Sequence, residues 1–150
     1  MVTEPSSEPA LAALAAKLRD HDPRAQAAAL EELAEIGPPA QSLLAELRPL
    51  LDSDNGHVRL AAALALSRID PDADAGRLLD VAAAAMLQTS FGMRAYAARI
   101  LGRMGAFAAP RAPLLIERLR TDKASDARAA AAWALGRLSP HVPEAPHALI

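Results

Sequence analysis

Residues 36–69 read IGPPAQSLLAELRPLLDSDNGHVRLAAALALSRI. Each half of this stretch carries apolar residues at steps of three and four, which is the spacing of one helix face. Between the halves lies DSDNG (52–56), a run of residue types that favour turns and helix starts. The stretch therefore predicts two amphipathic helices joined by a short turn.

The second of these two helices has counterparts elsewhere in the chain. Four segments align without gaps: QAAALEELAEIG (26–37), RLAAALALSRID (59–70), RAYAARILGRMG (94–105) and RAAAAWALGRLS (128–139). Their first residues are separated by 33, 35 and 34 positions, and an apolar-periodic stretch precedes each segment. Asp22–Pro23 and Ser125–Asp126 are predicted helix starts, with a capping side chain at or near the first turn. A lone helix pair cannot bury its apolar stripe, so a repeat of this length predicts a stacked array. We predict an all-α solenoid of about four helix-turn-helix repeats, over residues 10–40, 41–74, 75–109 and 110–140.

The two ends of the chain are expected to differ from the repeats. Residues 1–9 are predicted to form a disordered tail. Shifted by 34 positions, LGRLSPHVPEAPHALI (135–150) lies over LGRMGAFAAPRAPLLI (101–116), so the chain stops a few residues into a partial fifth repeat. Three interpretations stay open: a short cap, a piece of a longer solenoid, or self-association in which another chain covers the C-terminal end.

Composition supports the helical prediction and excludes several classes of protein. Hydrophobic residues make up 52% of the chain but aromatic residues only 3%, and most of the apolar content is Ala and Leu. Without cysteine there is no disulfide, no thiol nucleophile and no thiolate metal site. The acidic N-terminus is unlike a signal peptide, and no apolar run approaches the roughly 20 residues of a membrane span. We expect a cytoplasmic protein.

The net charge of −2 hides a difference between the two halves of the chain. Residues 1–75 hold 13 acids and 6 bases, whereas residues 76–150 hold 5 acids and 10 bases. The halves therefore carry −7 and +5, a polarity that would orient a charged partner.

Residues 36–69 resemble the repeats of HEAT-repeat proteins, specifically the short bacterial kind also found in phycobilisome-lyase-like chains. The resemblance rests on the Asp-rich turn, the Val58–Arg59 pair and the Ala-Ala and Ala-Leu spacing that follows, and it covers about residues 10–140. It implies an α-solenoid whose first helices lie on the convex side and whose second helices line a concave surface.

The resemblance also implies a structural role for the arginine that opens three of the four segments. These ladder arginines would pair with acids in the turns of their own or neighbouring repeats. Asp122 lies six residues before Arg128, whereas Arg94 has no acid in its own turn and would need a partner such as Asp54 from the previous repeat. Buried charges are normally paired, so we expect these arginines to brace the repeats.

A different set of positions is predicted to face outward. At 100° per residue, the third, sixth and tenth positions of each segment lie opposite the apolar stripe. They include the chain's only Trp, its only Tyr and a column of arginines at the tenth position. The predicted contact residues are Leu64, Tyr96, Arg99 and Trp133, and the residues predicted to select an acidic or anionic partner are Arg68, Arg103 and Arg137.

Two interpretations of this face compete. The arginine column is also what the macrodipole favours in the last turn of a helix, so for these residues the alternatives stay open. Tyr96, Arg99 and Trp133 together favour binding, since these residue types are enriched at interface hot spots. Gly102 and Gly136 lie beside the arginines inside helices, where they either permit close helix approach or clear space in the groove.

Candidate metal sites are weak. The turn DPDADAG (70–76) resembles the start of a calcium loop, but its sixth position is Ala75 and its twelfth is Val81, where such a loop needs Gly and Glu. Helix-start and ladder roles explain these acids better. Near the C-terminus, a metal site could draw on His141, Glu144 and His147, but Pro143 and Pro146 interrupt any helix that would set their geometry. We expect no metal and no cofactor.

Catalytic motifs are also missing from the sequence. It contains no Gly-rich phosphate loop, no G-x-S-x-G and no H-E-x-x-H. The pair Glu31 and Glu35 would suit acid–base chemistry only if it were buried in a pocket. We expect that the protein is not an enzyme.

The predicted function is a non-catalytic protein–protein interaction scaffold that binds an acidic or anionic partner on the concave face of the second helices. Nucleic-acid binding is an alternative, because arginines and aromatic residues also suit phosphates and bases. The net charge of −2, with Glu31 and Glu35 at one end of the groove, argues against it. A lyase-like or accessory subunit acting on a chromophore or metabolite is a second alternative, which only the resemblance implies.

Overall fold

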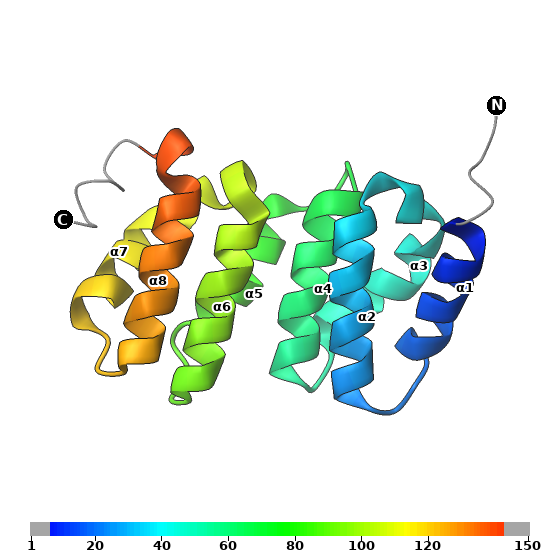
Figure 1. Ribbon diagram of the computed structural model, residues 1–150, viewed down its shortest axis with the longest axis horizontal. Coiled ribbons are helices and arrows are strands. Elements are labelled where there is room, and N and C mark those ends of the chain that lie inside the picture. The colour runs from blue at the N-terminus through cyan, green and yellow to red at the C-terminus, as the bar shows by residue number, and fades with distance from the viewer. Residues whose placement is uncertain (1–6, 143–150) are drawn as a thin grey trace. The chain divides into compact units, whose positions relative to one another are not determined.

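The computed structural model describes residues 7–142, and its regular structure over that range is helical, without strands (Figure 1). The predicted all-α class is therefore confirmed. The chain divides into two compact units, Met1–Ala73 and Asp74–Ile150, called unit 1 and unit 2 below. Their boundary lies one residue before the predicted junction of the second and third repeats.

Unit 1 holds the first two helix pairs. Helix α1 packs on α2, and α2 packs in turn along α4 (Figure 1). The elements in chain order are α1 (Ser7–Leu18), α2 (Pro23–Ile36), η1 (Pro38–Leu43), α3 (Leu44–Leu47), η2 (Arg48–Asp52) and α4 (Gly56–Ile69).

The first helix of the second repeat is broken, although its apolar periodicity predicts one continuous helix. The short α3 lies between the two 3-10 segments η1 and η2. Pro38 and Pro39 open η1, and Pro49 lies in the first turn of η2. Proline lacks an N–H and clashes with the preceding helical turn, so these prolines favour short 3-10 segments.

Unit 2 also holds two helix pairs. The first helix of its last pair, α7, is longer than α3, the corresponding helix of unit 1. Helices α6 and α8 lie side by side, and α7 packs on α8 (Figure 1). The elements are α5 (Ala75–Ala85), α6 (Phe91–Met104), η3 (Gly105–Arg111), α7 (Ala112–Thr121), α8 (Ser125–Leu138) and η4 (Ser139–His141).

Local signals place the helix ends. The Asp22 side chain accepts a hydrogen bond from the Arg24 N–H at 3.0 Å, with Pro23 as the first helical residue, which confirms that predicted start. Helix α8 begins at Ser125 as predicted, but its N-cap is Ala124 and no side chain caps it. Gly37 and Gly105 follow α2 and α6 with φ of 72° and 63°, a region where other residues are strained.

The ends of the chain are only partly described. Helix α1 begins at Ser7, so the structure places residues 7–9 of the predicted tail in a helix. Residues 1–6, the rest of that tail, lie outside the described residues. So do residues 143–150, for which a cap or a partial fifth repeat is predicted.

Candidate protein-binding site

In unit 2, five of the six predicted outward positions lie at the surface, and the exception is Ala130, which is buried. Arg99 and Arg137 are exposed, Trp133 is 46% exposed, and Tyr96 and Arg103 are half-buried. Together these five residues are called the α6–α8 face below.

Trp133 is held in place by groups from two helices. A Cβ added to Gly102 of α6 would lie 2.6 Å from Cζ3 of the indole, so the ring edge rests against the α6 backbone. The Arg137 guanidinium lies over the ring, 5.5 Å from its centroid, in cation–π geometry. The indole is therefore fixed in orientation although nearly half of it meets solvent.

Gly102 also sets the distance between α6 and α8. Its hypothetical Cβ would lie 2.9 Å from the Cα of Ala134, a backbone atom that cannot move without shifting the helix. The close-approach interpretation of Gly102 is thus confirmed. Gly136 differs, because an added Cβ there would meet nothing within 4 Å.

Arg99 supplies an exposed charge on α6, one turn before the glycine that contacts the ring. It precedes Gly102 by three positions on α6, so the two residues are neighbours on the helix surface. Over residues 7–142, no side chain or carbonyl forms a hydrogen bond or ion pair with its guanidinium. Its charge is accordingly available to a ligand.

In unit 1 the prediction for Leu64 is wrong. Leu64 is 0% exposed. Helix α4 packs against α2, α3, η1 and η2, so it is surrounded on several sides and almost its whole circumference is buried. The projection opposite the apolar stripe assumed a helix with one free face, and Leu64 cannot contact a partner.

Arg68 faces the surface but is engaged within unit 1. Its Nη1 donates to Glu35 Oε1 at 3.1 Å and to the Ala34 carbonyl at 3.4 Å. The tenth positions of two successive repeats thus pair with each other. This contact assigns Arg68 a role in joining repeats and leaves the α6–α8 face as the candidate site.

The ladder arginine of α6 pairs with the following repeat. Arg94 Nε and Nη2 donate to the two carboxylate oxygens of Asp122 at 2.7 and 2.8 Å. The expected partner, Asp54 of the previous repeat, is therefore incorrect. Arg94 pairs with the following repeat and not with the previous one, because the packing of α6 on α8 brings Asp122, in the turn between α7 and α8, within reach.

Asp122 is buried, and its carboxylate is stabilised in the charged form. It is 5% exposed and also accepts from the Ala124 N–H at 3.0 Å. The hydrogen bond from Arg94 is the main cause that lowers the pKa of Asp122 from 3.8 to about 2, against the opposing effect of burial.

All three ladder arginines share a contact that the sequence reasoning missed. Each donates from Nη1 to the backbone carbonyl six residues earlier, in the turn before its helix. The pairs are Arg59 to Ser53 at 2.6 Å, Arg94 to Gln88 at 2.9 Å and Arg128 to Asp122 at 2.8 Å. The constant spacing of six residues is the sequence signal for this contact, although its partner is a backbone carbonyl and not an acidic side chain.

Comparison with known families identifies the family to which these repeats belong. A family model described as HEAT repeats matches residues 9–89, and one described as HEAT repeat matches residues 112–142. The first match alone covers more than half of the chain. This chain belongs to the HEAT-repeat family. HEAT repeats are typical protein-interaction scaffolds, and the family is generally non-catalytic.

Among solved structures, the chain is similar to the crystal structure of an engineered protein from the Northeast Structural Genomics Consortium. The TM-score is 0.55 at 24% sequence identity, which supports the all-α solenoid fold and nothing beyond it. The match covers 93% of this chain but 66% of that one, so the chain spans slightly less than two thirds of its length. A search of the curated proteins found no match.

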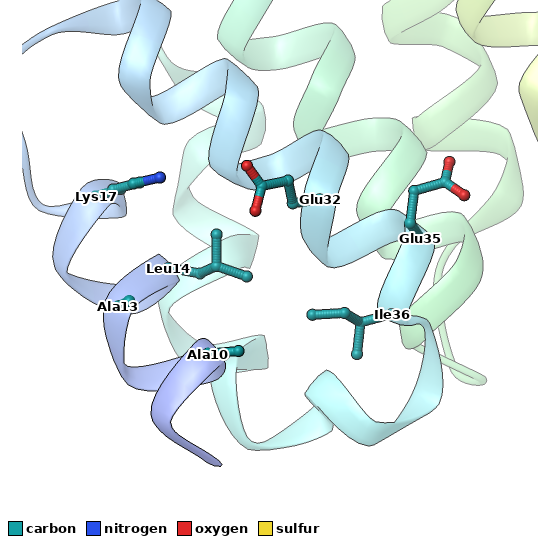
Figure 2. A pocket seen from close by; sticks show the side chains of 7 residues that line it. All are labelled: Ala10, Ala13, Leu14, Lys17, Glu32, Glu35 and Ile36. Atoms are coloured by element: carbon teal, nitrogen blue, oxygen red, sulfur yellow. The ribbon is translucent and has the colours of Figure 1, made fainter. Parts of the chain in front are cut away.

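The first HEAT repeat has a surface hollow that sequence reasoning missed (Figure 2). It measures about 390 Å³, lies between α1 and α2, and is largely apolar. Lys17 and Glu32 lie at one end of it, and Ala10 and Ile36 at the other. The lining residues are Ala10, Ala13, Leu14, Lys17, Glu32, Glu35 and Ile36. The alanines spaced by three on α1, too small to fill the gap, were its sequence signal.

The calcium-like turn before the third HEAT repeat is occupied by structural contacts. Asp70 accepts from the Asp72 N–H at 3.0 Å and pairs with Arg48 at 3.1 Å. Asp74 caps α5 by accepting from the Arg77 N–H at 3.2 Å. Asp74 thus has the helix-start role that the sequence favoured, whereas Asp70 pairs with Arg48 of η2 and not with a ladder arginine.

Between residues 7 and 142, no three His, Cys, Asp or Glu side chains lie close enough to hold a metal ion. In the same range, no helix has the length and apolar character needed to cross a membrane.

Proposed function

We propose that this HEAT-repeat chain is a non-catalytic scaffold that binds an acidic segment of another protein on its α6–α8 face. The observation that carries the proposal is Trp133, a large aromatic side chain that stays 46% exposed while Gly102 and Arg137 hold its orientation. Trp, Tyr and Arg dominate the energetics of protein interfaces, and this face combines all three.

Charge favours an acidic partner. Unit 2 holds 10 bases and 6 acids, a net charge of +4, whereas unit 1 holds 6 bases and 12 acids, a net charge of −6. Arg99 of α6 and Arg137 of α8 add two exposed cations, and Arg137 lies over the ring. Carboxylates that approach this face therefore meet both a favourable long-range potential and specific donors.

A protein partner is favoured over nucleic acid. Specific nucleic-acid binding commonly engages about 6–10 phosphates. In unit 2, Arg94 and Arg111 are held in ion pairs with Asp122 and Asp80, which reduces the cations available.

The test is binding of an acidic peptide followed by Trp133 fluorescence, since this is the only tryptophan. A twelve-residue Asp/Glu-rich peptide is expected to change the emission and to protect it from acrylamide, and a Lys-rich peptide is not. The double variant Arg99→Glu with Arg137→Glu should weaken binding by about tenfold or more, since charge-assisted bonds contribute about 1.5–3 kcal/mol each.

The matched control changes the same charge elsewhere in unit 2. Arg120 and Lys123 are exposed on and just after α7, so Arg120→Glu with Lys123→Glu alters the net charge equally. An equal loss of binding in both double variants would show attraction without a site and contradict the proposal. Tighter binding of oligo-dT than of the acidic peptide would support a nucleic-acid partner instead.

A further inference from the structure

Trp133 is more tightly constrained than an exposed side chain of a solvated helix needs to be. Its ring edge rests on the backbone of α6 at Gly102, and Arg137, one turn further along α8, covers the ring. Both constraints come from the same pattern, Leu-Gly-Arg, which occurs at residues 101–103 and 135–137. The Gly of the first copy receives the ring, and the Arg of the second copy lies over it.

Packing of the repeat does not require an indole at this position. The corresponding residues in the other three repeats are Glu31, Leu64 and Arg99. The core side of α8 is filled without it, by Ala127, Ala130, Ala131, Ala134, Leu135 and Leu138. The exposed indole therefore leaves apolar surface in water without completing the core.

We propose that Gly102 seats Trp133 as a preformed stacking platform, and that the acidic segment bound there carries an aromatic side chain beside its carboxylates. This inference rests on the proposed function and specifies its partner. The incoming ring stacks on the exposed part of the indole, while neighbouring carboxylates reach Arg99 and Arg137. Gly102 acts through Trp133 and is a positioning residue.

Preorganisation is the physical reason for expecting an aromatic residue. A free tryptophan side chain loses rotamer freedom when a ligand stacks on it, but this one is already ordered by Gly102 and Arg137. Aromatic pairs gain about 0.5–1.5 kcal/mol beyond the area they bury, and this gain depends on ring geometry. An aliphatic side chain of similar size buries area without that geometric term.

Three twelve-residue peptides test the inference: an Asp/Glu-rich peptide with one central Phe, the same peptide with Leu, and a Ser/Gly-rich peptide with the Phe. The Phe-containing acidic peptide should bind about fivefold more tightly than the Leu-containing one, which is the preference that aromatic pairing supplies. The uncharged peptide should bind most weakly, because it carries no carboxylate side chains that Arg99 and Arg137 could bind.

Protein variants then test whether the preference for the Phe peptide depends on Trp133 and Gly102. Measured by titration calorimetry, which does not need the tryptophan, Trp133→Leu should reduce the Phe-over-Leu affinity ratio to below about twofold while still binding the acidic peptide. Gly102→Ala should lower the ratio as well, since the added Cβ displaces the ring. Gly136→Ala, the same change where no atom lies within 4 Å, should leave it unchanged. Since Gly102→Ala also disturbs the α6–α8 contact, Trp133→Leu keeps the test decisive if that variant fails to fold.

The outcomes separate this inference from the proposed function. Equal binding of the Phe and Leu acidic peptides to the wild-type chain would overturn the stacking platform and leave the acidic-partner proposal standing. A ratio unchanged in Trp133→Leu would overturn it too. No binding of either acidic peptide would overturn both proposals, and so would a clear preference for oligo-dT.

Discussion

Asp122 links the third and fourth repeats through one buried carboxylate. Both of its oxygens accept from Arg94 of α6, and its backbone carbonyl accepts from Arg128 of α8. Among the residues described, it is the buried charged one. Removing one partner of such a pair leaves the other charge buried without compensation, which commonly costs about 3–5 kcal/mol.

The lowered pKa of Asp122 makes stability depend on acid pH. The folded-state pKa is about 2, below the ordinary 3.8, so the unfolded chain takes up the proton first as pH falls. The contribution of this carboxylate is present above about pH 4 and is lost as pH falls towards 2. It amounts to about 2 kcal/mol, measurable as the free energy of urea unfolding at successive pH values.

Asp122→Asn provides the comparison for this prediction. The variant should be less stable at pH 7 and should lose less stability between about pH 4 and pH 2, since its side chain does not titrate. If both chains showed the same pH dependence in that window, other carboxylates would be responsible.

Two glycines in the same Leu-Gly-Arg pattern should respond oppositely to alanine. Gly102→Ala places a Cβ 2.9 Å from the Ala134 Cα, and overpacking of this kind costs about 1–3 kcal/mol. Gly136→Ala meets no neighbour within 4 Å and should gain about 0.5–1 kcal/mol from reduced unfolded-state freedom. Thermal unfolding followed by circular dichroism measures both, and a stabilised Gly102→Ala would contradict the close approach of α6 and α8.

At the scale of elements, the helices of each repeat are specified to different degrees. The second helices α2, α4, α6 and α8 are each continuous over 14 residues. The first helices vary more: Pro38, Pro39 and Pro49 break that of the second repeat, and η3 precedes α7 in the fourth. The repeats are therefore most alike along the second helices, two of which form the candidate binding face.

The hollow between α1 and α2 predicts a stabilising substitution. Ala13 lines it and is exposed, so Ala13→Leu adds apolar volume where space exists. Burial of the added methyl groups at about 25 cal/mol per Å² should raise the unfolding free energy by about 0.5–1.5 kcal/mol. Ala12→Leu, on the same helix but outside the hollow, should change it by less than about 0.5 kcal/mol. Equal effects of the two substitutions on the denaturation midpoint would show that the hollow does not close.

For the whole molecule, the uneven charge is the property that most affects partners. Unit 1 carries −6 and unit 2 carries +4, although the chain as a whole carries only −2. An average over the whole chain would predict repulsion of an acidic ligand. The local sign at the α6–α8 face predicts attraction.

Binding of an acidic peptide should therefore weaken with salt. Between about 50 mM and about 500 mM NaCl, screening of exposed charges should lower the affinity by about three- to tenfold. The stacking contribution of Trp133 does not depend on salt, so the Phe-over-Leu ratio should stay constant. An affinity that did not change with salt would indicate an apolar site in place of a charged one.

Much of the fold was predictable because its signals are local and repeated. Periodicity, a repeat of about 34 residues and the Asp22–Pro23 helix start placed the helices and the family. The surface positions of Arg99, Trp133 and Arg137 followed from the same helical projection. The prediction that Leu64 faces outward failed because the pattern of a single helix does not show how many other elements surround that helix.

The sequence by itself determined the helix pairs, the family and the residues on the outward stripe of α6 and α8, since these depend on spacing along the chain. Three features depend on contacts between elements: the pairing of Arg94 with Asp122, the burial of Leu64 and the seating of Trp133 on Gly102. Spacing does not specify them, because each is set by how closely two helices approach and which side chains meet there. In RAYAARILGRMG (94–105), the arginine that pairs across repeats and the glycine that receives the indole acquire their roles only through α8 and the turn before it.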